Sequence, residues 1–281
     1  MKTLLSVIEA GSIAKAAQLE NLSAPALGQR ITALEDQLKV QLLVRAKHRS
    51  QPTRACQRLM PLFLALAQTA NDIRHLADPD GLSGPYRLGM VGTALADHSK
   101  AIVSSFQHEA PSANLSIIPG SSIDLYEKLA RGCLDAILAV RPPFSVSRGL
   151  TFKTVDRSQT VFISPKGHDD PASLPILLYD KQAWGGALIW NWLVTSGGAT
   201  EVLCEMDEPL VIANLVATGL GAAYLPHWKA LDSVGGLEMS VVNMAPVREL
   251  AFIYHESGNA LDDVVLRAVT AAGARGPKAM R

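Results

Sequence analysis

Several features are scarce or missing in this sequence of 281 residues, and each absence excludes a class of protein. The longest nearly apolar run covers only residues 59–67 and contains a proline, whereas a membrane-spanning helix needs about 18 apolar residues. No apolar region with a cleavage site follows the first residues, so a cytoplasmic location is expected. Three cysteines are too few and too scattered for a disulfide framework or a zinc site.

Enzyme signatures are missing as well. The sequence contains no G-x-S-x-G, no Walker loop and no H-E-x-x-H motif, and its seven histidines lack metal-ligand spacing. Cys133 stands at the entry to an apolar strand, which predicts a buried, unreactive thiol rather than a redox switch with Cys204. We therefore expect a protein that is not an enzyme and that uses no cofactor or metal ion.

A net charge of zero hides an uneven distribution of charge. Residues 1–70 contain nine basic and four acidic residues, which gives +5, whereas the remainder contains 17 basic and 22 acidic residues, which gives −5. A small basic module attached to a larger acidic body favours a polyanion as the partner of the first part only. The charge alone leaves nucleic acid as one candidate among several.

The first 38 residues are typical of three short helices. Gly11 is a suitable end for the first helix, and Ser12 and Ser23 are good N-caps for the second and third. The third helix carries one buried stripe with 4-3-4 spacing, made by Leu27, Ile31, Leu34 and Leu38. Two short helices joined by a tight turn predict a helix-turn-helix.

The next segment predicts a wing and a long helix. Residues 41–53 combine an apolar start with a basic tip, which is typical of a small β-wing. Thr53 then caps a helix over residues 54–76 whose apolar positions repeat in a heptad pattern. The seam consists of Leu59, Leu62, Leu66, Thr69, Ile73 and Leu76. This seam favours a partner chain, although packing on the wing or on the third helix remains the alternative.

Turn-forming residues at 78–85 mark a hinge, and strands alternate with helices beyond it. Strands are expected at 86–91, 114–118 and 134–140, and helices at 95–109 and 123–132, an order that predicts a parallel sheet covered by helices. A second unit contains strands at 160–164, 176–179 and 222–225 and a helix at 208–218. A strand at 249–254 and a helix at 262–272 complete the chain.

The N-terminal pattern resembles the LysR-type transcriptional regulators. The matching residues are Glu9-Ala-Gly-Ser12, Ala16-Ala17, Leu22-Ser-Ala-Pro-Ala-Leu27, Leu34-Glu35, Pro52-Thr53-Arg-Ala55 and Leu59-Met-Pro61. Residues 129–136 and 215–226 resemble the family's effector domain. The resemblance implies a winged helix-turn-helix with a linker helix, followed by a two-lobed α/β domain similar to periplasmic binding proteins. It also implies a homodimer, a homotetramer, and RNA polymerase as a candidate partner.

The expected boundaries follow from both arguments. They are a DNA-binding domain at 1–53, a dimerisation helix at 54–77, a hinge at 78–85 and an effector domain at 86–281. Lobe I is expected at 86–156 and 246–272, and lobe II at 157–245. The chain departs from the family at Ala24, where Gln is usual, and at Gly28, Leu43 and Cys56. Because two of these positions lie on the recognition helix, the operator cannot be inferred.

Two groups of residues are expected to contact DNA. The third helix presents Ser23, Ala24, Pro25, Gly28, Gln29 and Arg30 near its N-terminal end, where Gln can pair with adenine and Arg with guanine in the major groove. The wing supplies Arg45, Lys47, His48 and Arg49 for phosphate contacts. Arg45 has a structural alternative, an ion pair with Glu35 or Asp36.

Effector contacts are expected at the carboxyl ends of strands, where open α/β sheets bind ligands. Two such loops place hydroxyls before helices, at Thr93-Ala94 and at Ser121-Ser122, and these suit a carboxylate unless they are simple N-caps. Residues of the second lobe can face them, namely Tyr179, Asp180, Trp184, Met206 and Asp207. The sequence thus predicts a DNA-binding regulator modulated by a small molecule. The alternatives are a binding protein with a degenerate helix-turn-helix and an enzyme with an accessory domain.

Overall fold

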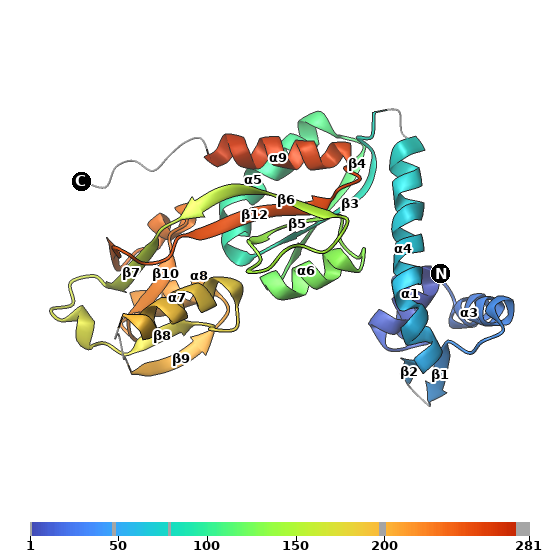
Figure 1. Ribbon diagram of the computed structural model, residues 1–281, viewed down its shortest axis with the longest axis horizontal. Helices are drawn as coiled ribbons and strands as arrows, with labels where there is room; N and C mark the ends of the chain where they lie inside the picture. Colours follow the sequence, from blue (N-terminus) through green and yellow to red (C-terminus); the bar gives the residue numbers. More distant parts are fainter. Residues whose placement is uncertain (1, 47–48, 78–79, 197–200, 274–281) are drawn as a thin grey trace. The chain divides into compact units, whose positions relative to one another are not determined.

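The computed structural model describes residues 2–46, 49–77, 80–196 and 201–273. The chain divides into two compact units, the first ending at Arg74 and the second beginning at His75 (Figure 1). Within these described ranges, no helix is long and apolar enough to cross a membrane.

The N-terminal unit begins with three helices, α1 (Lys2–Ala10), α2 (Ile13–Leu19) and α3 (Ala24–Leu38). Gly11 ends α1 with a φ of 72°, a left-handed conformation that glycine adopts without steric cost. The hydroxyl of Ser12 accepts the backbone N–H of Lys15, and that of Ser23 accepts the N–H of Ala26. Both predicted N-caps are therefore present, and they fix where α2 and α3 begin.

The wing and the long helix complete this unit. Strand β1 (Leu43–Ala46) pairs antiparallel with β2 (Arg49–Pro52), and α4 (Arg54–Ala77) follows directly. The Thr53 hydroxyl accepts the N–H of Cys56 and donates to the carbonyl of Gln41, so it caps α4 and also holds the start of the wing. The helices and wing share one core, which contains Leu4, Val7, Leu27, Ile31, Leu42, Leu43, Cys56 and Phe63.

Lobe I of the C-terminal unit is a five-stranded sheet in the order β4-β3-β5-β12-β6. Its strands are β3 (Gly84–Met90), β4 (Ala113–Pro119), β5 (Ala136–Val140), β6 (Leu150–Ser158) and β12 (Arg248–His255). Helices α5 (Gly92–Glu109) and α9 (Ala260–Gly273) pack against each other over one face, and α6 (Ser122–Ala130) covers the opposite face (Figure 1).

Lobe II contains a three-stranded sheet in the order β10-β7-β11 and the parallel pair β8-β9. Its elements are β7 (Thr160–Pro165), β8 (Ile176–Tyr179), α7 (Trp184–Thr195), β9 (Val202–Met206), α8 (Pro209–Ala217), β10 (Ala223–Pro226) and β11 (Leu237–Val241), with 3-10 turns η1 (Pro171–Ser173) and η2 (Lys229–Ser233). The chain passes between the lobes from β6 to β7 and returns from β11 to β12. Each lobe has its own apolar core.

The predicted parallel sheet is only partly correct. β3 pairs in parallel with β4 and β5, as the alternating pattern indicates, but β12 pairs antiparallel with both β5 and β6. Strands β6, β9 and β11 were not predicted, and all three lie at the edge of a sheet. An edge strand exposes much of its surface, so its sequence lacks the apolar run that identifies a central strand.

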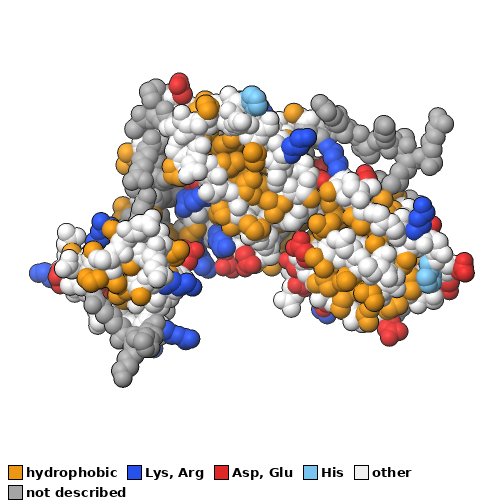
Figure 2. All heavy atoms as spheres, turned by 180° about the vertical axis from the view of Figure 1, so that it is seen from behind, with side chains coloured by type: hydrophobic (Ala, Val, Ile, Leu, Met, Phe, Trp, Pro, Cys, Tyr) orange, Lys and Arg blue, Asp and Glu red, His pale blue; other side chains and the backbone are white. Residues whose placement is uncertain are grey.

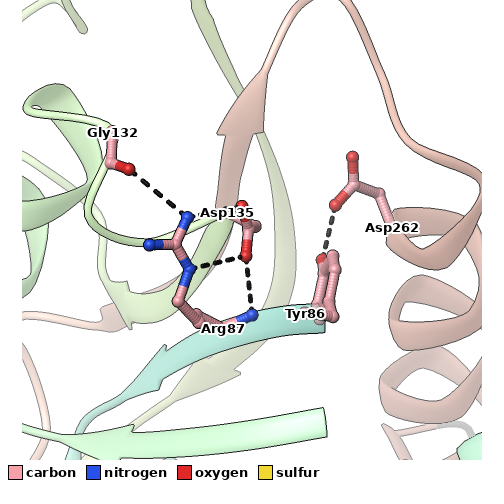
Figure 3. Close-up of polar contacts among 5 residues, drawn as sticks. All are labelled: Tyr86, Arg87, Gly132, Asp135 and Asp262. Carbon is pink, nitrogen blue, oxygen red and sulfur yellow. Dashed lines mark hydrogen bonds and ion pairs between the residues drawn. The ribbon is translucent and has the colours of Figure 1, made fainter. Parts of the chain in front are cut away.

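Two polar contacts fix the start of β3 within lobe I (Figure 3). Arg87 donates to both carboxylate oxygens of the buried Asp135, and its backbone N–H also bonds that carboxylate at 2.7 Å. On the other side of the strand, the Tyr86 hydroxyl donates to Asp262 at the start of α9, at 2.5 Å. These bonds join β3 to the turn before β5 and to the last helix.

Candidate DNA-binding face and effector cavity

The N-terminal end of α3 presents an exposed face. Ala24, Pro25, Gln29 and Arg30 are all exposed, and Gly28 lies among them without a side chain. All of these except Arg30 line a shallow hollow of about 500 Å³, together with Ile13 of α2 and residues of the middle of α3. Ser23 caps the N–H of Ala26 and Pro25 has none, so the N–H of Ala24 is the first-turn donor that remains for a phosphate oxygen.

The basic tip of the wing is described only in part. Arg49 begins β2 and its side chain is exposed, which leaves its guanidinium free to reach a phosphate. Arg45 lies in β1 opposite Ser50, but its side chain lies outside the described residues, as do Lys47 and His48. Their predicted phosphate contacts stay predictions.

A cavity of about 340 Å³ lies at the carboxyl ends of β3 and β4, where the two lobes meet. Lobe I supplies Thr93 and Leu95 at the start of α5, and Ser121 and Ser122 at the start of α6. Lobe II supplies the opposite wall with Tyr179, Asp207, Glu208 and Pro209. The parallel pairing of β3 and β4 therefore brings the two predicted hydroxyl loops to one edge of the sheet.

The oxygens of three hydroxyls of lobe I already accept hydrogen bonds from the protein. Ser121 Oγ accepts the N–H of Asp124 at 3.1 Å, and Ser122 Oγ accepts the N–H of Val140 at 3.2 Å. Thr93 Oγ1 accepts a hydrogen bond from the Arg248 guanidinium at 3.0 Å. Because protein N–H groups occupy these oxygens, each hydroxyl proton is directed elsewhere. This edge of the cavity thus suits a ligand group that accepts hydrogen bonds.

Arg248 is a buried cation beside the cavity that sequence reasoning missed. It begins β12, is 5% exposed and donates to the hydroxyls of Thr93 and Ser158. Its Nε has no hydrogen-bond partner, and among the described residues it forms no ion pair. Burial lowers its pKa, since removing a cation from water is costly. A single arginine at the start of a strand gives no signal in the sequence that it is buried.

The wall from lobe II is acidic. Asp207 and Glu208 line the cavity, and the Glu208 carboxylate lies so close to Gly92 that a side chain there would collide with it. Burial, and then the carboxylates of Asp180, Glu208 and Asp124, raise the pKa of Asp207 to about 6. Figure 2 shows acidic side chains gathered on the margin of lobe II that borders lobe I. This wall suits a ligand group that donates hydrogen bonds or carries a positive charge.

Three predicted effector residues do not line the cavity. Ala94 is buried in the core of lobe I. Trp184 packs edge-to-face against Tyr126 and Phe144, with ring centroids at 5.7 and 5.4 Å, so it joins α7 to lobe I instead. Met206 packs against the core of lobe II, one residue before the cavity wall.

Cys133 is exposed rather than buried as predicted, because the chain is still in a turn before β5 begins.

A second contact joins the two lobes near the cavity. The Asp97 carboxylate on α5 accepts the backbone N–H groups of Lys229 and Ala230, both at 2.9 Å, at the start of η2. The Arg248 bonds, by contrast, join the start of β12 to α5 and to the end of β6. The Asp97 contact is therefore the one of the two that would break if the lobes moved apart.

The comparisons with known proteins cover both units. Residues 1–57 match the model of the bacterial regulatory helix-turn-helix protein, lysR family, and residues 79–269 match the LysR substrate binding domain. The probable HTH-type transcriptional regulator LrrA of Synechococcus elongatus is 28% identical over 245 residues, which cover 82% of this chain and 81% of LrrA. AlsR of Bacillus subtilis, another HTH-type transcriptional regulator, is 27% identical over 80% of this chain and 79% of its own.

Solved structures show the same fold. A full-length OxyR variant from Pseudomonas aeruginosa superposes with a TM-score of 0.73 at 22% identity and covers 95% of this chain and 92% of its own. Full-length CbnR in complex with its target DNA gives a TM-score of 0.61 at 17% identity, over 97% of this chain and 98% of CbnR. The likeness thus extends over both compact units.

Proposed function

The chain belongs to the LysR family of helix-turn-helix regulators, and we propose that a small ligand with a carboxylate controls it from the cavity between the lobes. It is a DNA-binding transcriptional regulator with an effector-binding domain, and its relatives are regulators rather than enzymes. The alternative of a degenerate helix-turn-helix finds no support in these comparisons. We place the protein in the cytoplasm, where its DNA partner would be.

One observation carries the assignment of the ligand: three hydroxyls on one cavity edge whose oxygens already accept protein N–H groups. Their protons, the first-turn N–H groups of α5 and α6, and the nearby Arg248 all favour an anion. A carboxylate carries oxygen acceptors for these donors and a charge that offsets the buried guanidinium. The cavity of about 340 Å³ suits a ligand at the small end of the usual range.

For DNA, we propose that Gln29 and Arg30 read bases while Ser23, Ala24, Pro25 and Gly28 allow close approach of the α3 backbone. The exposure of this face supports the assignment. Arg49, with Arg45, Lys47 and His48, would contact phosphates and fix the position of the wing. The boundaries 1–53, 54–77, 78–85 and 86–281, with the two lobes as predicted, remain our working division of the chain.

The proposed mechanism is a shift between two lobe arrangements. A ligand that contacts both walls stabilises the arrangement in which its contacts are complete, and it can shift the balance only by that difference in affinity. In a homodimer paired into a tetramer, such a shift would change the spacing of the helix-turn-helix units and the bending of DNA. Contact with RNA polymerase would then transmit the change to transcription.

Two substitutions test the cavity. Thr93→Val keeps the volume but removes the hydroxyl, and Ser121→Ala removes a second donor, so each should weaken ligand binding by about 1 to 3 kcal/mol. A saturating effector at 100 times its Kd stabilises the fold by about 2.7 kcal/mol, which thermal unfolding detects readily. Ser99→Ala, which removes a hydroxyl bonded within α5, is the matched control.

DNA retardation completes the test. Without ligand, both variants should bind operator DNA as the wild type does, while the response of DNA binding to effector is lost. Unchanged affinity of both variants for a physiological effector would show that the ligand binds elsewhere. Loss of DNA binding in the unliganded variants would instead indicate that these residues only stabilise the fold.

A further inference from the structure

We propose that the cavity recognises an amino-carboxylate, whose protonated amine contacts the wall formed by Asp207, Glu208 and Tyr179. This rests on the proposed function, because the carboxylate of the same ligand would meet the hydroxyls of lobe I. It goes further by assigning a second, cationic group to the effector and a recognition role to lobe II. The ligand would then bridge the two lobes through opposite charges.

The first argument is the distribution of charge around the cavity. Asp207 and Glu208 line it, none of the described lining residues is basic, and the buried Arg248 lies behind the lining, bonded to Thr93 on the lobe I side. Partial burial raises the pKa of Asp207, and the carboxylates of Asp180, Glu208 and Asp124 raise it further. Negative charges held together in a partly buried wall repel one another, and a cation relieves that repulsion. A ligand with carboxylates alone would increase it.

The second argument is independent of the acidic residues. Tyr179 is 6% exposed and lines the same cavity, yet its hydroxyl forms no hydrogen bond among the described residues. A tyrosine hydroxyl on a cavity wall with no protein partner is available to a polar group of a ligand. Burial raises the pKa of Tyr179, so the hydroxyl stays protonated and can accept one of the ammonium hydrogens.

The geometry of Gly92 connects the two walls. A Cβ at this position would collide with Oε1 of Glu208, so the absence of a side chain lets the acidic wall approach the first turn of α5. The acceptors of lobe II therefore lie close to the donors of lobe I across a narrow space. That separation suits a compound whose amine and carboxylate are close together, as they are in an α-amino acid.

The test uses the full chain and matched sets of compounds. Each set contains an L-amino acid, the carboxylic acid of the same skeleton without the amine, and the amine without the carboxylate. Thermal unfolding selects the sets that bind, and calorimetry then gives the Kd of each member. For the best set, we expect the amino acid to bind about tenfold more tightly, or better, than its des-amino acid, because a charge-assisted hydrogen bond is lost.

Variants of the wall identify the source of this preference. Asp207→Asn should bring the ratio of the two Kd values close to one while the des-amino acid keeps its affinity. Glu208→Gln is the second variant, in case Asp207→Asn does not fold. Asp169→Asn, which changes an exposed acid on a lobe II turn, should leave the ratio unchanged and serves as the control.

The outcomes separate the two proposals. If des-amino acids bind as tightly as amino acids, amine recognition is wrong, whereas a carboxylate site in the cavity stands. If amino acids are preferred but neither wall variant reduces the ratio, the amine contacts another surface and this proposal is rejected. If no compound of the sets raises the melting temperature, both the carboxylate site and the amine site are rejected for ligands of this size.

Discussion

Tyr86 and Asp262 show how one buried pair links pH to stability (Figure 3). Burial raises the pKa of Asp262 to about 7, although its bonds from the Tyr86 hydroxyl and the N–H of Asn259 act in the opposite direction. The folded chain therefore binds this proton more tightly than the unfolded chain does. Stability from this group is fully present below about pH 4 and is lost as the pH rises through 7.

At the residue scale, we predict that Tyr86→Phe destabilises lobe I in a pH-dependent way. The variant leaves the ionised Asp262 without its strongest donor, so at about pH 8 it should lose roughly 1 to 3 kcal/mol of the free energy of unfolding. At about pH 5 the carboxyl group is protonated in the folded chain, and the loss should be smaller. Denaturant unfolding at both pH values measures the difference.

Tyr254→Phe provides the control. Tyr254 is half-buried in the same sheet, and its hydroxyl forms no hydrogen bond among the described residues. Its removal should have little effect at either pH. An equal loss at both pH values in Tyr86→Phe would contradict the assignment of the pH dependence to Asp262.

At the scale of elements, Glu35 joins the recognition helix to the wing. Its Oε1 accepts the backbone N–H of Leu42 at 2.7 Å and that of Leu43 at 3.0 Å. Both donors lie just after α3, where the chain turns into β1, and both residues are buried. The structure thus gives Glu35 a role in positioning the wing relative to the face that we assign to DNA.

We predict that Glu35→Ala loosens this junction. Losing the acceptor of two charge-assisted bonds should lower the local stability of the wing by about 1 to 3 kcal/mol, measured by hydrogen exchange of the Leu42 and Leu43 amides. Glu35→Gln, which keeps an oxygen acceptor, should recover part of the loss. Glu9→Ala removes an exposed acid on α1 and should leave this exchange unchanged.

The wing itself carries a prediction about salt. Each phosphate contact contributes about −0.9 to the slope of log K against log salt, so Arg49→Ala should flatten the slope by about one unit per protomer. Operator and random duplexes should weaken by similar factors, because phosphates carry no sequence information. Lys100→Ala, on α5 of the other unit, is the control. A variant that weakens operator binding alone would assign Arg49 to base recognition.

At the scale of the whole molecule, α4 carries an apolar face that the described residues of the N-terminal unit leave uncovered. Leu62 and Leu66 are 62% and 57% exposed, and Ile73 is 61% exposed, although all three belong to the predicted heptad seam. Phe63 faces the other way, into the core of the N-terminal unit. The exposed leucines support a second copy of this chain as the partner of α4.

We predict that Leu62→Asp combined with Leu66→Asp abolishes dimerisation through α4. Burying a leucine is worth roughly 1.5 to 3 kcal/mol, and a two-fold interface loses each contribution twice. Sedimentation should show a folded protein of lower mass with weak DNA binding. Gln57→Asp, which adds a charge on an exposed side of the same helix, should leave the mass unchanged. An intact dimer in the double variant would show that Leu62 and Leu66 do not form the dimer interface.

The sequence by itself determined the elements whose signals are local. Ser12, Ser23 and Thr53 cap the helices that they were expected to cap, because an N-cap depends only on the next three residues. The parallel order of β3, β4 and β5 followed from the alternation of strands and helices. It was enough to predict that Thr93, Ser121 and Ser122 share one edge, and they do line one cavity.

Only the tertiary structure decided what surrounds that edge. Arg248 reaches Thr93 across 155 residues of sequence, and Trp184 packs on Tyr126 from the other lobe instead of lining the cavity. Edge strand β6, which pairs with β12 beside the crossing between the lobes, gave no apolar run to predict it. Such contacts form between segments distant in sequence, and their free energy depends on burial and distance. Neither quantity is encoded in the local spacing of residue types, which is why the hydroxyls could be predicted and their buried cation could not.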